Sequence, residues 1–184
     1  MEILQGLTLL QNIHPLFVHF PIALVLVVLL FEILWQAFKK EEFRSMATWL
    51  LYLGALSAVA AVISGVIASN GLGHDSPGHD LVHVHRDIMY WMTGILVITA
   101  VAVLFAKPLR NGAQRKWLII PLLITSALLI YGADKGGVLV FEHGMGVNLK
   151  IQNPESFQVE TDEEKAKKPA RKTHIHRDGK EHKH

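Results

Sequence analysis

Long apolar runs separated by short polar segments make up most of the chain before about position 141. A helix needs about 20 apolar residues to cross about 30 Å of hydrocarbon. Four runs approach this length, and the last does so only if it continues to about 141: about 15 or 21 to 38, 46–69, 87–106 and 117–131. We therefore predict an all-α fold, a four-helix transmembrane bundle over residues 1–147 in a lipid bilayer.

From about Asn148 the chain becomes rich in Glu, Lys, His and Pro and poor in apolar residues. Such a composition buries too little apolar surface to offset the entropy of ordering. Residues 148–184 are therefore predicted to be a disordered polar tail. Its histidine-rich end could bind divalent metal loosely.

Composition narrows the function classes for this chain of 184 residues, 51% of them hydrophobic. Cysteine is absent, which excludes disulfides, thiolate metal sites, iron–sulfur clusters and covalent c-type haem attachment. The net charge of +2 gives no indication of nucleic-acid binding. Nothing matches a Ser/His/Asp triad or a phosphate-binding glycine loop, so no enzyme activity is predicted.

Basic residues set the expected orientation in the membrane, because short cytoplasmic loops are rich in Lys and Arg. The second loop carries only Arg86, whereas the first and third loops carry Lys39, Lys40, Arg44, Lys107, Arg110, Arg115 and Lys116. We expect the first and third loops to face the cytoplasm. Both termini and the second loop would then lie on the periplasmic side of a bacterial inner membrane. No cleaved signal peptide is expected in residues 1–13.

Histidines gather on the predicted periplasmic side. Seven of the eleven lie there, at the ends of the apolar runs: His14, His19, His74, His79, His83, His85 and His143. Ionisable side chains at membrane depth are costly and often mark cofactor or metal sites, and imidazole is the commonest metal ligand. A histidine-based haem or metal site near the outer face is therefore the leading hypothesis.

The segment NIHPLFVHFPIAL opens the first run. Proline is tolerated in the first helical turn and costly in the helix interior, so Pro15 and Pro21 indicate that a helix begins or kinks here. His14 and His19 would lie about 140° apart around that helix. The two histidines therefore need not serve the same site.

The second loop is histidine-rich and becomes compatible with a helix from His79. In such a helix His79 and His83 share one face at i, i+4, as do His85 and Met89. A zinc or copper site would use His79 and His83 with a carboxylate; the candidates are Asp75, Asp80 and Asp87.

Two further regions carry polar groups. After the fourth run, GADKGGVLVFEHGMGV places Asp134, Glu142 and His143 on the histidine side. Glu32 lies deep in the first run, toward the cytoplasmic side. It is either a hydrogen-bond partner between helices or one station of a proton path.

HPLFVHFPIAL, the His-Arg pair entering the third run and GGVLVFEHGMGV together resemble the bacterial membrane family labelled domain of unknown function 2231. The resemblance covers about residues 12–147 and implies a four-helix membrane domain, without an established reaction. Some relatives are joined to or encoded near c-type cytochromes, which implies a redox partner of that kind. His74, His79 and His83 are not part of the pattern. The family-like positions are His14, His19, His85, Gly137, His143, Gly144 and Gly146.

The leading functional hypothesis is electron transfer through a haem b held by imidazoles on facing helices. We predict His19 and His85 as axial ligands, with His14 and His143 as alternates or as neighbours that orient the ligands. Arg86 is suited to a haem propionate.

Two other classes stay open. One is a protein that binds or transports Zn²⁺, Cu²⁺ or Ni²⁺. The other is a non-catalytic membrane subunit, without a cofactor, that anchors a larger complex. Haem predicts a Soret band, metal handling predicts bound Zn or Cu dependent on His79 and His83, and a scaffold predicts a copurifying partner.

Overall fold

The structure is a computed structural model, and it describes residues 12–71 and 78–146. By its internal contacts the chain divides into one unit of residues 1–147 and another of residues 148–184. All described residues belong to the first unit. The predicted disorder of the tail falls outside the described residues, as do His74 and Asp75.

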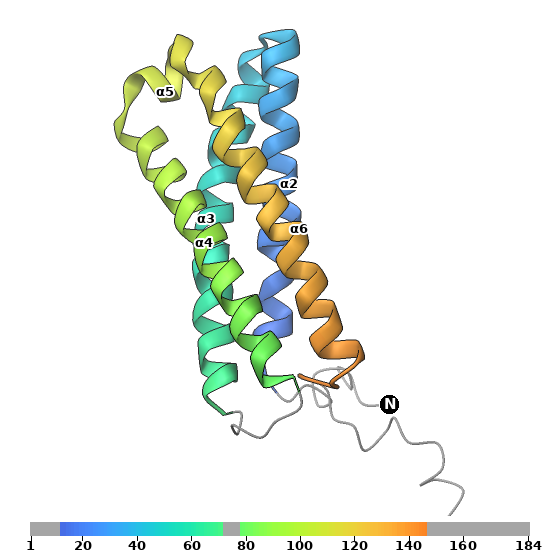
Figure 1. Cartoon of the computed structure of the whole chain (residues 1–184). Helices are drawn as coiled ribbons and strands as arrows, with labels where there is room; N and C mark the ends of the chain where they lie inside the picture. Colours follow the sequence, from blue (N-terminus) through green and yellow to red (C-terminus); the bar gives the residue numbers. More distant parts are fainter. Residues whose placement is uncertain (1–11, 72–77, 147–184) are drawn as a thin grey trace, which may run out of the picture. The chain divides into compact units, whose positions relative to one another are not determined.

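The prediction of an all-α four-helix bundle is confirmed (Figure 1). Within the described residues, four helical segments are long and apolar enough to cross a membrane. They measure 25, 30, 27 and 29 residues, and the last of them, Ala113–Phe141, joins a 3₁₀ turn to an α-helix. The elements are α2 (His14–Phe38), α3 (Glu41–Asn70), α4 (His79–Phe105), the short α5 (Lys107–Asn111), the 3₁₀ helix η1 (Ala113–Leu118) and α6 (Ile119–Phe141).

The helices are longer than the apolar runs that predicted them. α3 begins at Glu41, where Glu41 and Glu42 favour the positive end of the helix dipole. α4 begins at His79, so the polar segment before the third run is helical. α6 continues through Gly132 and Gly136 to Phe141. In a helix the backbone N–H and C=O groups bond to one another, and this is required in lipid because lipid chains offer them no partners.

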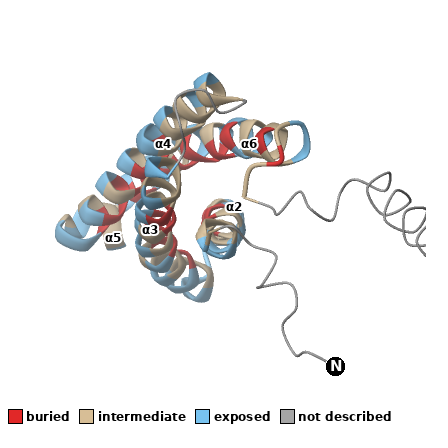
Figure 2. Cartoon of the chain, turned by 90° about the horizontal axis from the view of Figure 1, so that it is seen from below, coloured by how far each residue is buried: buried red, intermediate tan, exposed pale blue. Residues whose placement is uncertain are grey.

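Each long helix packs mainly against two neighbours. α2 packs against α3 and α6, and α4 packs against α3 and α6. α2 and α4 therefore occupy opposite corners of the bundle, as Figure 2 shows in the view along the helices. The core between them consists of fully buried aliphatic residues such as Val25, Leu51, Leu96 and Leu122.

Small residues explain the closest helix pair. Gly54, Ala58 and Ala61 lie on the face of α3 that is buried in the bundle. A Cβ on Gly54 would lie 3.5 Å from Cβ of Leu24 on α2. Small residues at helical spacing let two backbones approach closely in lipid, where packing rather than the hydrophobic effect holds helices together.

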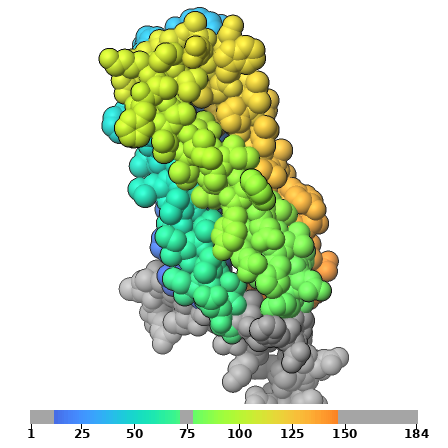
Figure 3. Space-filling view, turned by 60° about the vertical axis from the view of Figure 1, so that its left-hand side comes forward, coloured from blue at the N-terminus to red at the C-terminus, as the bar shows by residue number. Residues whose placement is uncertain are grey.

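Large apolar side chains cover the outside of the bundle. Figure 3 shows the face formed by α3, α4 and α5. On α4 the outward side chains include Trp91, Ile98 and Phe105, which are 72%, 70% and 77% exposed. An exterior of this kind suits contact with lipid chains rather than with water.

A buried ion pair ties the helices together at the end formed by the loops 39–40 and 106–118. Arg115 is fully buried, and Glu32 is 1% exposed. The guanidinium contacts both carboxylate oxygens; Nε donates to Oε2 over 3.2 Å, and Nη2 donates to Oε1. Glu32 therefore serves as a hydrogen-bond partner between helices.

The other Arg115 donors are also used. Nη1 donates to Thr48 Oγ1 over 2.9 Å and to the Arg110 carbonyl over 2.9 Å. Nη2 also reaches the Arg44 carbonyl at 3.3 Å. One side chain on η1 thus contacts α2, α3 and α5, and a buried arginine is tolerated because its donors and its charge are satisfied.

Candidate cofactor site

His14 stands at the first turn of α2 and points toward α3. Its backbone N–H donates to Asn12 Oδ1 over 3.1 Å, and its Nδ1 lies 3.0 Å from Ser64 Oγ. The Ser64 hydroxyl donates its proton to the Ala61 carbonyl over 2.9 Å. With the hydroxyl proton on that carbonyl, Nδ1 of His14 carries the hydrogen and donates it to Ser64. The Nε2 lone pair of His14 is then available to a ligand.

His85 is fixed in the same way from α4. Its Nδ1 lies 2.8 Å from the Gly132 carbonyl on α6. A carbonyl only accepts hydrogen bonds, so Nδ1 is the protonated nitrogen and Nε2 again carries the lone pair. A hydrogen bond that fixes the tautomer and orients the ring is typical of a metal-ligating histidine.

Each of these rings rests on a glycine of the neighbouring helix. A Cβ on Gly65 would lie 3.0 Å from His14 Cε1, and a Cβ on Gly136 would lie 3.2 Å from His85 Cε1. Both distances are tighter than ordinary contacts, so a side chain at either position would push against the ring. The glycines give the two imidazoles their places in the bundle.

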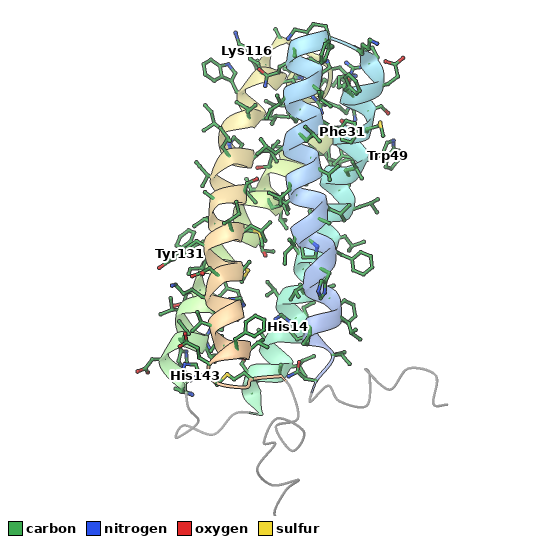
Figure 4. The ribbon with its side chains drawn as sticks, turned by 90° about the vertical axis from the view of Figure 1, so that its right-hand side faces the viewer. His14, Phe31, Trp49, Lys116, Tyr131 and His143 are labelled. Carbon is green, nitrogen blue, oxygen red and sulfur yellow. The ribbon has the colours of Figure 1, made fainter. Side chains whose placement is uncertain are left out.

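The two half-buried rings come from different helices of the bundle. α2 and α4 occupy opposite corners of the bundle, yet His14 and His85 are near enough to interact electrostatically. His14 lies at the same end of the bundle as His143 (Figure 4). The structure thus presents two oriented imidazoles from opposite corners at one end of the bundle.

His19 lies elsewhere on α2. Its side chain is exposed, and its Nδ1 donates to the Pro15 carbonyl over 2.7 Å within the same helix. Pro21 is inside α2 and buried, so the helix begins before it, at His14. Of the two histidines, His14 is the one whose ring packs against a neighbouring helix.

His79 and His83 do share a face of α4, as their spacing predicts. Their Nε2 atoms are 2.9 Å apart, and the ring planes meet at 75°. Asp80 and Asp87 are exposed, and Asp87 lies 3.6 Å from Arg86. Within residues 12–71 and 78–146, no group of three or more His, Cys, Asp or Glu side chains is arranged to hold a metal ion.

His143 packs against the start of α4. A Cβ on Gly78 would lie 2.6 Å from His143 Cδ2, and Gly78 has a φ of 79°, a conformation that suits glycine. Asp134 is exposed and pairs with Lys135 over 3.1 Å, and Glu142 is exposed. His143 therefore holds the end of α6 against α4.

The closing glycines return the chain to the start of α2. Gly144 and Gly146 have φ values of 63° and 81°. The Gly144 N–H donates to the Val140 carbonyl over 3.0 Å and so ends α6. A Cβ on Gly146 would lie 3.7 Å from Cγ of Pro15. The motifs HP and HGMG, far apart in sequence, meet at the end of the bundle that holds His14.

The bundle matches a known family of membrane proteins. Residues 10–149 match the family described as "Predicted membrane protein (DUF2231)". The chain belongs to this family. The match covers the whole bundle of the DUF2231 chain and leaves residues 150–184 outside. Comparisons with curated proteins and with solved structures gave no match.

Sequence reasoning missed Ser64 and Gly132, which orient the two imidazoles. Ser64 stands beside the stripe of small residues on α3, and its position opposite His14 follows only from the register of α2 and α3. Gly132 acts through its carbonyl, a group that every residue has. The glycines of the closing motif were the one signal that α6 approaches its neighbours closely here.

Proposed function

We propose that this DUF2231 chain is an electron-transfer protein that holds a haem b through His14 and His85. The observation that carries the proposal is that both imidazoles are held through Nδ1 by an oxygen of a neighbouring helix. Each Nδ1 lies within hydrogen-bond distance of an oxygen on a neighbouring helix, and an Nδ1 that donates there keeps the Nε2 lone pair for a ligand. Four-helix bundles build haem sites from side chains on facing helices.

The donor set favours haem over a metal ion bound by protein alone. A structural zinc site uses four protein ligands, and a catalytic one uses three. A haem brings four porphyrin nitrogens and needs only one or two axial ligands from the protein. Two imidazoles without a third ligand, within the part of the chain that the structure describes, therefore suit haem.

Other residues around the pair support the same proposal. The Ser64 hydroxyl and the Gly132 carbonyl fix the tautomers and raise the basicity of the ligand nitrogens. Arg86 follows His85, and its Nε forms a 3.6 Å ion pair with Asp87 Oδ1; a haem propionate would have to compete with this exposed carboxylate for the guanidinium. When bound, haem would supply reversible one-electron transfer.

The position of the pair suggests where electrons would be exchanged. His14 is in the first turn of α2, and His85 is in the second turn of α4, so both lie near one membrane surface. The distribution of basic loop residues supports the proposal that this is the periplasmic surface. A c-type cytochrome or another periplasmic redox protein would be the partner.

The test is a reduced-minus-oxidised absorption spectrum of the full chain, purified in mild detergent after expression with haem supplied. We expect a Soret band that shifts on reduction, sharp α and β bands, and about one iron per chain. Elemental analysis of the same sample gives the iron. A colourless protein without iron after haem supply and after in vitro haem titration would refute the proposal and favour a scaffold role.

The contact between His79 and His83 favours a second, separate candidate, the binding of Cu²⁺ or Zn²⁺ at this end. Their Nε2 atoms are 2.9 Å apart, and an ion bound by both nitrogens would take its remaining ligands from water, so we expect weaker binding than at a site with three or four protein ligands. Calorimetric titration with each metal should show one site that disappears in His79→Ala/His83→Ala and persists in His19→Ala. Equal uptake by both variants would contradict this candidate.

A further inference from the structure

A cluster of basic and aromatic side chains lies at the end of the bundle opposite the histidines. α2 ends at Phe38, and Lys39 follows with a φ of 54°. This left-handed turn brings Lys39 Nζ back over the Trp35 ring, 4.7 Å from its centroid. The Arg115 guanidinium lies 5.5 Å from the centroid of the same ring. Trp35 therefore joins the end of α2 to η1.

Lys116 belongs to the same edge, although it is far from Lys39 in the sequence. The Gln36 amide of α2 reaches the Lys116 carbonyl at 3.5 Å. Figure 4 shows Lys116 beside the end of α2. Lys116 Nζ lies 5.5 Å from the centroid of the Trp117 ring. The Gln36 contact and the stacking of Arg115 on Trp35 thus join the two lysine–tryptophan pairs, Lys39 with Trp35 and Lys116 with Trp117, at one end of the bundle.

The positive charge of this cluster is not neutralised by its neighbours. The Glu32 carboxylate is taken by Arg115, and the Glu41 carboxylate is paired with Arg44. Within residues 12–71 and 78–146, no carboxylate forms an ion pair with Lys39 or Lys116. Both lysines are exposed, and Trp117 is 59% exposed.

Position and chemistry together indicate the ligand. The cluster lies at the ends of two membrane-spanning helices, where indole rings sit at headgroup level and lysines reach toward phosphates. Basic pockets between helices on the cytoplasmic side bind anionic headgroups. We propose that Lys39 and Lys116, with Gln36 and Trp117, bind the phosphate of an anionic phospholipid. This site does not depend on the haem proposal, because it lies at the other end of the bundle.

The experiment measures lipid retention by the full chain in detergent, using native mass spectrometry with phosphatidylglycerol, phosphatidylcholine and inorganic phosphate in separate arms. We expect the chain to retain phosphatidylglycerol in preference to phosphatidylcholine. Lys39 and Lys116 should each contribute roughly a fivefold preference for phosphatidylglycerol over phosphatidylcholine. Retention in the phosphate arm alone would assign the site to a free anion and overturn the lipid proposal.

Matched variants separate a defined site from diffuse attraction. Lys39→Gln/Lys116→Gln should lose the preference for phosphatidylglycerol by roughly tenfold or more. Lys40→Gln/Lys107→Gln removes two exposed lysines from the same end and should stay within about twofold of the native chain. Lys39→Arg/Lys116→Arg keeps the charge and should keep the selectivity even if the glutamine variant folds poorly. Equal losses in both glutamine variants, or a loss in the arginine variant, would overturn the proposal.

Discussion

Arg115→Ala should destabilise the bundle more than any other single substitution discussed for this chain, by about 3–5 kcal/mol. The change leaves the Glu32 carboxylate buried and without its partner, and it removes the links from η1 to α3 and α5. Thermal unfolding in detergent, followed by tryptophan fluorescence, provides the measurement. Trp35 reports locally, since the guanidinium lies over its ring.

Two variants show whether the loss comes from the uncompensated charge. Arg110→Ala removes a basic side chain from the adjacent α5 but keeps the carbonyl that Arg115 uses, so it should cost less than about 1 kcal/mol. Glu32→Leu/Arg115→Met replaces the pair with apolar side chains and should recover most of the lost stability. If Arg115→Ala melts with the native chain, the pair does not hold this end together.

The sequence indicated that Glu32 forms hydrogen bonds between helices or belongs to a proton path, but it did not identify the residue that pairs with it. Arg115 looked like one of several loop residues that orient the chain, because a short basic segment before an apolar run is typical of a cytoplasmic loop. Eighty-three positions separate it from Glu32, and only the pairing of α2 with η1 brings them together. A carboxylate within an apolar span does indicate a polar or charged partner, but nothing in the sequence pointed to Arg115.

The fold itself was predictable because lipid imposes so few options. The lengths of the apolar runs sufficed for the number of spans, and the requirement for internal backbone hydrogen bonds made them helices. The ends of α3 and α4 were not predictable from hydropathy, since Glu41–Ser45 and His79–Arg86 are polar turns of continuous helices. In α6 the glycines suggested an early end, but they serve close packing instead.

The site was predictable as a location more than as a set of contacts. The patterns placed histidines at one end of the bundle and marked His14, His19 and His85. Choosing between His14 and His19 requires knowing which face of α2 is covered by α3. The small residues around Ser64 show which face of α3 is buried, but they identify the covered face of α2 only once the register of the two helices is known.

Removing either imidazole of the proposed pair should abolish the low-spin haem spectrum. His14→Gly and His85→Gly each delete one Nε2 donor, and each leaves a space that free imidazole fits. Added imidazole should therefore restore the low-spin α and β bands in both variants. Ser64→Ala keeps the His14 ring but removes the acceptor of its Nδ1 proton, and it should weaken haem affinity by roughly tenfold. Haem titration followed by absorption spectroscopy measures all of these effects.

His19→Gly is the matched control, because His19 is on the same helix, five residues from His14, with an exposed ring bonded to its own backbone. It should bind haem as the native chain does. The opposite pattern, with loss in His19→Gly and none in His14→Gly, would keep the haem but assign it to His19 and His85. Because the His14 ring contacts α3 whereas the His19 ring is exposed, that result would require His19 to turn into the bundle when haem binds. A spectrum unchanged in all three histidine variants would rule out axial ligation by His14, His19 and His85.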